Sequence, residues 1–141
     1  MTTTSGRRFA LGLLIPAALL LGANAQAQSC PLSGQTSMLV VQMFFGQNDG
    51  KRVIAPAAWQ SFLRDDITAR FPDGLTVFDA YGQWRDPKTS RLARERSKVV
   101  EIATSDTPDV HSKIEDIAAH YRVRFHQQSV GVVTMPGCAR F

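Results

Sequence analysis

The chain has 141 residues with sixteen Lys and Arg against twelve Asp and Glu, and 44% of its residues are hydrophobic, as in an ordinary globular protein. The formal net charge of +4 includes Arg7 and Arg8, and it falls to +2 without them. Such a small positive charge does not support nucleic-acid binding, so we expect no nucleic-acid partner.

The first 27 residues are predicted to be a secretory signal peptide. Arg7 and Arg8 precede an apolar run, Phe9–Leu21, and small residues suit cleavage after Ala25 or Ala27. The run is too short to span a bilayer comfortably, which disfavours a retained membrane anchor. Because Phe9 follows the two arginines without a spacer, Sec export is favoured over the twin-arginine route. We therefore expect an exported protein, periplasmic or secreted, whose mature chain has no transmembrane segment.

Residues 28–141, about 114 in number, are the size of one small domain and contain both cysteines. Cys30 and Cys138 stand near the two ends of that domain. An even number of cysteines in an oxidising compartment predicts a disulfide, and neither cysteine has a Cys or His nearby that would suggest a metal or thiol site. Lipidation of Cys30 is disfavoured because the preceding residues lack the Leu and small-residue pattern of a lipoprotein.

Hydrophobic periodicity predicts four strands and two helices. The first strand is apolar on both faces, as is typical of a central strand. Pro56 and Pro108 suit first helical positions, and Thr107 suits an N-cap. The Pro136-Gly137 pair is expected to end the last strand. In chain order we expect a strand Met38–Phe45, a helix Pro56–Phe71, strands Leu75–Trp84 and Arg96–Ala103, a helix that opens at Thr107-Pro108 and carries Arg122 and Arg124 in its last turns, and a strand Gln128–Met135.

This order predicts an α+β fold of the ferredoxin-like βαββαβ type, a four-stranded antiparallel sheet with both helices on one face. In that topology the last strand runs antiparallel beside the first, which would bring Cys138 to Cys30. Trp59 lies on the apolar stripe of the first helix and is expected in the core.

The other sheet face would be uncovered and partly apolar, which is typical of an interface or a ligand groove. We expect a homodimer through this open face. The alternative is a monomer in which the segment Gln28–Ser37 folds across it.

Several stretches resemble the family catalogued as domain of unknown function 3574: FPDGLTVFDAYGQWRD, RERSKVVEI, YRVRFHQQSV and a final CARF. The resemblance covers Leu39 to Phe141, and Gly82-Gln83-Trp84 and the run from Arg94 to Lys98 are its most specific parts. It implies a small exported bacterial protein and no particular activity. Arg96 stands where the family usually has Pro, and the hairpin tip from Lys88 to Arg91 lacks a Gly.

The hairpin between the two middle strands carries most of the unusual side chains. We predict a mixed apolar and cationic groove there, for a small anionic or aromatic ligand or for the carboxylates of a partner protein. The function we expect is therefore a binding module of the cell envelope. The candidate ligand-binding residues are Tyr81, Trp84, Arg85, Arg94 and Lys98.

The alternative is a cofactor-independent enzyme of the dimeric α/β-barrel type. Glu95 and Lys98 could form an acid–base pair, or Ser97 with Lys98 a nucleophile and its base. A purely structural interpretation is that Arg94 and Glu95 form cross-strand ion pairs while Trp84 covers the sheet edge.

Metal and cofactor sites have little support in the sequence. The three histidines, His111, His120 and His126, are spread along one helix, and only His111 with Glu115 has i,i+4 spacing. The chain contains no Gly-rich phosphate loop, G-x-S-x-G or H-E-x-x-H motif. We expect no metal and no cofactor.

Overall fold

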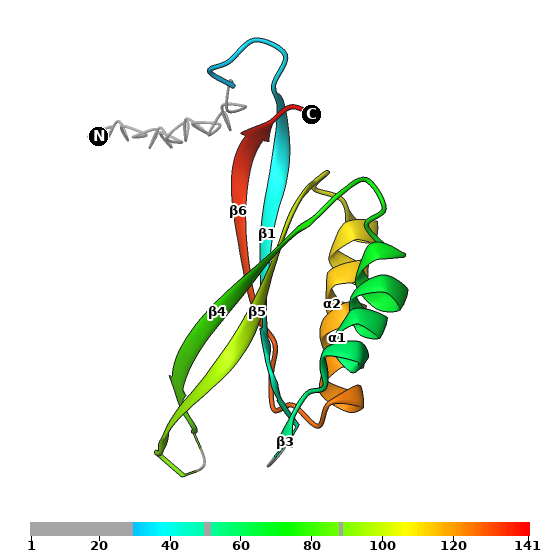
Figure 1. Ribbon diagram of the computed structural model, residues 1–141. Coiled ribbons are helices and arrows are strands. Elements are labelled where there is room, and N and C mark those ends of the chain that lie inside the picture. Colours follow the sequence, from blue (N-terminus) through cyan, green and yellow to red (C-terminus); the bar gives the residue numbers. More distant parts are fainter. Residues whose placement is uncertain (1–29, 50–51, 88) are drawn as a thin grey trace, which may run out of the picture.

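The computed structural model describes residues 30–49, 52–87 and 89–141, so the expected signal peptide at 1–27 lies outside the described residues. The described chain builds a four-stranded antiparallel sheet in the order β4-β5-β1-β6, with the helices on one face (Figure 1). This confirms the predicted ferredoxin-like architecture. Among these residues no helix is long and apolar enough to cross a membrane. The elements are β1 (Thr36–Gly46), β2 (Asn48–Asp49), β3 (Arg52–Val53), α1 (Pro56–Phe62), a π-helix η1 (Leu63–Thr68), β4 (Thr76–Arg85), β5 (Leu92–Thr104), α2 (Pro108–Arg124) and β6 (Gly131–Ala139).

The core lies between the helices and one face of the sheet. β1 is central, as its apolar sequence predicts, and sends every second side chain toward the helices. Phe45 packs against the rings of Trp59, Phe62 and Tyr121, with ring centroids 5.5, 5.9 and 4.7 Å away. Trp59 is 2% exposed, which confirms its expected place in the core. The buried apolar residues are Leu39, Val41, Met43, Phe45, Ile54, Trp59, Phe62, Ile67, Phe71, Val100, Ile102, Val110, Ile114, Ile117, Tyr121 and Phe125.

The first helix departs from its prediction as one α-helix, Pro56–Phe71. Its α-helical part ends at Phe62, and the π-helix η1 follows. Phe62 and Ile67 are both fully buried although they are five residues apart. Five residues are about 1.4 turns of an α-helix, whereas the i→i+5 hydrogen bonding of a π-helix returns the chain to the same face after five residues. The wider turn therefore lets both side chains enter the core.

The second helix begins and ends as its sequence predicts. Thr107 is the N-cap, and its Oγ1 accepts a hydrogen bond from the Val110 N–H at 3.3 Å. Arg122 and Arg124 lie in the last turn, where cations favour the negative end of the helix dipole.

The last strand differs from its prediction as Gln128–Met135. It begins at Gly131 and continues through Pro136 and Gly137 to Ala139, so the expected stop at Pro136-Gly137 is wrong. β6 is an edge strand, where a proline without an N–H is tolerated. A Cβ on Gly137 would lie 2.8 Å from Cγ2 of Val40, so glycine permits close pairing with β1.

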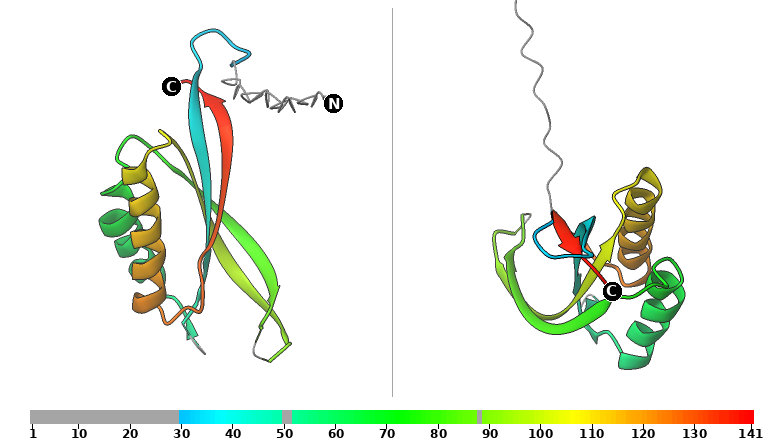
Figure 2. Two further views of the ribbon diagram at one scale, coloured as in Figure 1. Left: turned by 180° about the vertical axis from the view of Figure 1, so that it is seen from behind. Right: turned by 90° about the horizontal axis from the view of Figure 1, so that it is seen from above.

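The β4–β5 hairpin is longer than predicted, because β5 begins at Leu92 rather than Arg96. Its strands twist away from the helices and extend past their ends (Figure 2). The segment after β1 contains the short antiparallel pair β2 and β3.

The disulfide Cys30–Cys138 is present, with the two Cα atoms 5.6 Å apart, and confirms the predicted pairing. The Gln35 side chain donates to the Cys138 carbonyl at 3.1 Å, and Arg140 donates to the Ser33 carbonyl at 2.7 Å. These contacts hold residues 30–35 beyond the end of β1 and β6 (Figure 1). The described part of the segment Gln28–Ser37 therefore does not fold across the open face.

Candidate functional site

The register of the β4–β5 hairpin divides the predicted site residues between two faces. Val77 pairs with the buried Val100, so the pairs Asp79–Lys98 and Tyr81–Arg96 share the face toward the helices. Side chains alternate along each strand, which places Arg85 and Arg94 on this face as well. Trp84, Glu95 and Ser97 belong to the opposite, open face. The five expected ligand-binding residues therefore do not line one groove, because Trp84 faces away from the other four.

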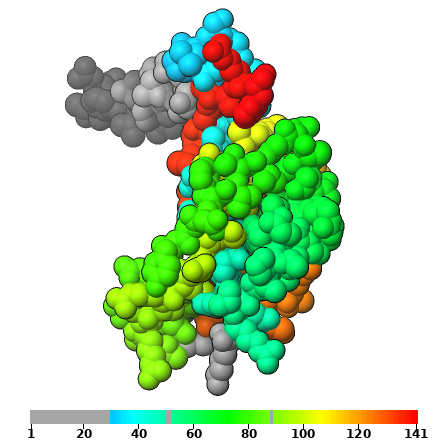
Figure 3. All heavy atoms as spheres, in the orientation of Figure 1, coloured from blue at the N-terminus to red at the C-terminus, as the bar shows by residue number. Residues whose placement is uncertain are grey.

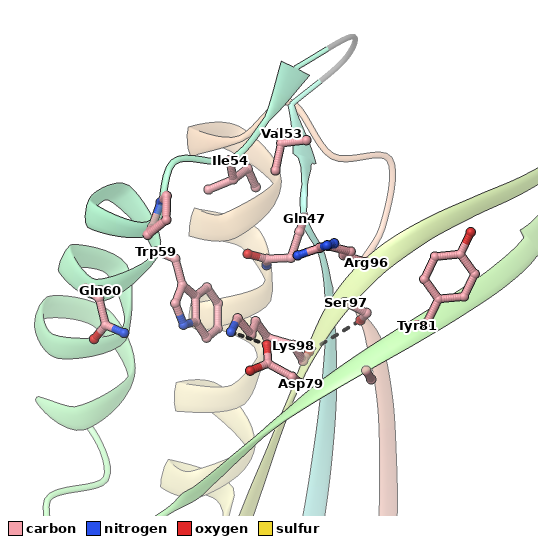
Figure 4. A pocket seen from close by; sticks show the side chains of 12 residues that line it. Gln47, Val53, Ile54, Trp59, Gln60, Asp79, Tyr81, Arg96, Ser97 and Lys98 are labelled. Carbon is pink, nitrogen blue, oxygen red and sulfur yellow. Dashed lines mark hydrogen bonds and ion pairs between the residues drawn. The ribbon is translucent and has the colours of Figure 1, made fainter.

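A cleft of about 610 Å³ lies between α1 and the helix-side face of the hairpin, and we call it the helix-side cleft. It forms because the hairpin twists away from α1, and the hairpin tip stands apart from the body of the molecule in Figure 3. Figure 4 shows Trp59 and Gln60 on the α1 side and Tyr81 on the hairpin side. The cleft is lined by Gln47, Val53, Ile54, Pro56, Trp59, Gln60, Asp79, Ala80, Tyr81, Arg96, Ser97 and Lys98.

Two cations and one carboxylate lie among the residues of the helix-side cleft. Lys98 and Asp79 form an ion pair across the hairpin (Figure 4). Arg96 is exposed, and among the described residues no carboxylate pairs with its guanidinium. Its own carbonyl accepts the Gln47 N–H at 2.9 Å, which ties this part of β5 to the chain after β1. Arg96 is therefore the cation of the cleft that is available to a ligand.

The two remaining cationic candidates lie nearer the hairpin tip. Arg94 is exposed and pairs with Gln83 in the strand register. Arg85 donates from Nη1 to the Ser90 carbonyl at 2.8 Å, which braces the turn. Neither residue lines the helix-side cleft. Both add positive charge to the same face of the hairpin, between the cleft and the tip.

A second pocket of about 290 Å³ lies on the open face, and we call it the open-face pocket. The Glu95 carboxylate is fixed there by two neutral donors. Trp84 Nε1 donates to Oε1 at 3.2 Å, and Asn48 Nδ2 donates to Oε2 at 2.9 Å. The pocket is lined by Phe44, Gly46, Gly82, Gln83, Trp84, Glu95, Ser97, Gln127, Gln128, Ser129 and Gly131.

Beneath this carboxylate, β1 ends at Gly46. A Cβ there would lie 2.8 Å from Oε1 of Glu95 and 3.0 Å from Oε1 of Gln127, so only glycine leaves room for both groups. The Gly46 carbonyl accepts a hydrogen bond from the Tyr121 hydroxyl at 2.6 Å. Burial raises the pKa of the Tyr121 phenol above its ordinary value, and the negative charge of Glu95 raises it further.

The three catalytic candidates are not brought together. Glu95 and Lys98 lie on opposite faces of β5, and Lys98 is paired with Asp79. Ser97 and Lys98 are neighbours whose side chains alternate, and the Ser97 hydroxyl donates to the Phe45 carbonyl at 3.2 Å. The arrangement contains no nucleophile–base pair between these residues. The cross-strand ion pairs of the structural interpretation are also absent, because within the described residues Arg94 lies opposite Gln83 and Glu95 opposite Gly82.

The histidines are separated as well. His111 contacts Asp106 and His126 contacts Asp49, while His120 contacts Asp66, which also pairs with Arg70 and Arg124. Within the described ranges no group of three or more potential metal ligands comes together.

The structure adds three residues that were not among the candidates. Arg96 could have been selected from its two-residue spacing with Arg94 and Lys98, because that spacing places all three on one strand face. Asn48 and Gln127 hold the open-face pocket from segments far away in sequence. Nothing in the local sequence pairs either of them with Glu95.

Of three similar solved structures, two have TM-scores above 0.5 and support the fold. The chain is similar to a phage SAM lyase in complex with S-methyl-5′-thioadenosine, with 18% identity and a TM-score of 0.56 over 72% of this chain and 90% of that chain. A phage SAM lyase in the apo state is also similar, with 19% identity and a TM-score of 0.53 over 82% of this chain and 98% of that chain. CutA from Synechococcus elongatus PCC7942, complexed with Bis-Tris, gives 8% identity and a TM-score of 0.48 over 75% and 87%. At these identities the likeness concerns the fold alone.

No curated protein matches the chain. The family model "Protein of unknown function (DUF3574)" matches residues 41–141, which are most of the chain and include part of β1 and all of β4, β5 and β6. The resemblance noted in the hairpin and in the final CARF is thereby confirmed, and the chain belongs to the DUF3574 family.

Proposed function

We propose that this protein is an exported binding module that holds a small aromatic anion in the helix-side cleft. The observation that carries the proposal is Arg96, an exposed guanidinium that lines a 610 Å³ cleft and has no carboxylate partner among the described residues. Arginine binds carboxylate or phosphate through two parallel hydrogen bonds, which makes an anionic group the natural partner.

The opposite wall of the cleft explains why the anion should also be apolar. Val53, Ile54 and Pro56 lie there beside Trp59, so a ligand anchored on Arg96 would extend its body over apolar surface. Tyr81 is 70% exposed on the hairpin wall and offers a ring and a hydroxyl group. The phage SAM lyase complex gives modest support, because a small molecule is bound there to a protein of similar fold.

Export is part of the same proposal. It rests on the signal-like sequence of residues 1–27 and is compatible with the disulfide Cys30–Cys138. Expression of the full chain in a bacterial host, followed by intact-mass measurement of the periplasmic fraction, tests it. We expect the mass to be lower by two hydrogen atoms than that of the reduced chain beginning at Gln26 or Gln28. Retention of residues 1–27 on the recovered protein would contradict export through a cleaved signal peptide.

The binding proposal is tested by titration with 2-naphthoate, using the neutral naphthalene-2-carboxamide for comparison. We expect the carboxylate to bind more tightly than the amide, and Arg96→Gln to weaken its binding about tenfold, the equivalent of about 1.4 kcal/mol. Arg122→Gln makes the same charge change at an exposed position on α2 and should leave binding unchanged.

Two results would overturn this function. One is equal affinity for the acid and the amide, and the other is unchanged binding of the acid by Arg96→Gln. Native mass spectrometry of oxidised protein isolated from the cell envelope then identifies the natural ligand, which we expect to be an anion.

We further propose that the open face of the sheet pairs with a second copy of the chain. Four apolar side chains on it are 38% to 48% exposed, which is typical of an interface rather than a solvated surface. The apolar residues of this face include Met38, Val40, Phe44, Phe78, Val99, Val133 and Met135.

Sedimentation of the oxidised protein tests the dimer. Phe78→Asp should convert a dimer into a monomer because it places a charge within the proposed interface. Val123→Asp adds the same charge on α2, where Val123 is 78% exposed, and should leave the protein dimeric. A monomer at all concentrations of the unaltered protein would refute the pairing.

A further inference from the structure

The open-face pocket has the opposite charge to the helix-side cleft. Among the described residues that line it, Glu95 is the one charged side chain. Phe44 and Trp84 contribute aromatic surface, while Gln83, Gln127 and Gln128 contribute amide groups. The pocket lies at the Gly46 end of the open face, six residues along β1 from the position where Val40 pairs with Met135.

Glu95 is held in place without being neutralised. Its two oxygens accept hydrogen bonds from Trp84 and Asn48, which are both neutral donors. No Lys, Arg or His in the described ranges forms an ion pair with it. This half-buried carboxylate has neutral donors but no cationic partner among the described residues, so its strongest complement is a cation.

The side-chain oxygen of Gln127 is a second hydrogen-bond acceptor close to the Glu95 carboxylate. The Gln127 amide nitrogen donates to the carbonyls of Asn48 and Phe125, which leaves its Oε1 directed toward Gly46. Oε1 of Glu95 lies above the same glycine. No described side chain or backbone N–H donates to Gln127 Oε1. Two oxygens without a cationic partner therefore face a pocket with an aromatic wall.

We infer that the open-face pocket is a second binding site, specific for a protonated amine. The ammonium group donates to Glu95 and Gln127, and the apolar part of the amine lies against Phe44 and Trp84. A compact cation beside aromatic rings gains a further attraction to their electron-rich faces. The site is distinct from the helix-side cleft, because the two lie on opposite faces of the hairpin and have Ser97 alone in common among their described lining residues.

The test uses nuclear magnetic resonance on the oxidised protein, and the probes are benzylamine, which is protonated at neutral pH, and benzyl alcohol. The chain has two tryptophans, so two indole N–H signals report on two places. Trp84 donates to Glu95, whereas Trp59 is buried in the core. We expect benzylamine to shift the Trp84 signal to saturation with little effect on Trp59, and benzyl alcohol to bind at least about tenfold more weakly.

Two variants test whether the Glu95 carboxylate supplies the negative charge that binds the amine. Glu95→Gln keeps the size of the side chain and an oxygen for Trp84, and it should weaken benzylamine binding about tenfold. Glu101→Gln makes the same change on the same strand and face, outside the pocket, and should leave binding unchanged. Rising salt should weaken the interaction in the unaltered protein, since Glu95 is half-buried rather than fully buried.

The inference is overturned if benzyl alcohol binds as tightly as benzylamine, or if Glu95→Gln binds benzylamine as well as the unaltered protein does. The comparison of the two probes needs no variant, so it decides the matter even if Glu95→Gln does not fold. Loss of 2-naphthoate binding in Arg96→Gln concerns the other face, so the two proposals can fail separately.

The amine could come from a free small molecule or from a lysine side chain of a partner protein. Nα-acetyl-lysine amide, in which only the side chain is an amine, distinguishes these sources. Binding comparable to that of benzylamine would indicate a lysine side chain, and binding restricted to benzylamine would indicate a free aromatic amine.

Discussion

Trp84 donates its indole N–H to the Glu95 carboxylate at 3.2 Å, from the strand next to the one that carries Glu95. Each of these residues was a candidate for function on its own, and the hydrogen bond makes them one unit. The indole fixes the carboxylate over Gly46, and the carboxylate fixes the indole against the open face.

The energetic value of this contact is measurable by a double-mutant cycle with Trp84→Phe and Glu95→Ala. A hydrogen bond to a charged acceptor predicts a coupling free energy of about 1–3 kcal/mol in urea unfolding. Trp84→Phe combined with Glu101→Ala serves as the reference cycle, because Glu101 bonds to Gln42 instead, and its effects should be additive. Zero coupling between Trp84 and Glu95 would show that their contact does not contribute in solution.

Gly46→Ala should destabilise the protein by about 1–3 kcal/mol, since its Cβ would lie 2.8 Å from Glu95 Oε1. Gly82→Ala is the matched control on the same face, because nothing lies within 4 Å of the position its Cβ would take. The unfolding midpoints in urea compare the two. Glu95→Ala combined with Gly46→Ala should recover part of the loss, and equal effects of the two glycine changes would contradict a close approach at Gly46.

Most of the fold follows from local patterns. The alternation along Thr76–Arg85 and Leu92–Thr104 determines which side chains face the helices, and the order of elements brings Cys30 to Cys138. The boundaries were less predictable where tertiary contacts override local preference. Pro136 remains in a strand because β6 is at an edge, and the π-helix forms because both Phe62 and Ile67 are buried.

The candidate site could be predicted only in part. The sequence indicates that the hairpin carries unusual side chains, and the two-residue period separates Trp84 from Lys98 onto opposite faces. The helix-side cleft depends on how far the hairpin twists away from α1, which no local pattern encodes. Similarly, Asn48 and Gln127 reach Glu95 and Gly46 through the path of the chain rather than through sequence proximity.

The disulfide should account for a large part of the stability, because Cys30 and Cys138 are 108 residues apart. In the chain-entropy model, a closed loop of this length stabilises the folded state by up to about 4–5 kcal/mol, and losses on removal are typically about 2–5 kcal/mol. Cys30→Ser together with Cys138→Ser should therefore lower the urea midpoint strongly.

The reduced unaltered protein is the control for that double variant and should show the same loss. The core does not include either cysteine, so the helical circular dichroism signal should persist at low urea. Equal midpoints for the oxidised and reduced proteins would contradict a stabilising role.

Tyr121 should make the protein sensitive to alkaline pH. Burial and the charge of Glu95 raise the pKa of its phenol above the ordinary value of 10.0, so the folded state holds the proton more tightly than the unfolded state does. Below about pH 10 both states are protonated, and this difference has no effect on stability. Above that pH the unfolded state releases the proton first, and the free energy of unfolding should fall by about 1.4 kcal/mol per pH unit until the folded pKa is reached.

The measurement compares the free energies of unfolding in urea of the unaltered protein and of Tyr121→Phe, from mildly alkaline pH up to the folded pKa. The contributions of the lysines and of Tyr81 cancel in the difference between the two proteins. The variant loses the hydrogen bonds to Gly46 and Gln47, so it should be less stable near neutral pH, and the gap should narrow as the pH rises. A gap that stays constant with pH would show that the two states hold the phenol proton equally well.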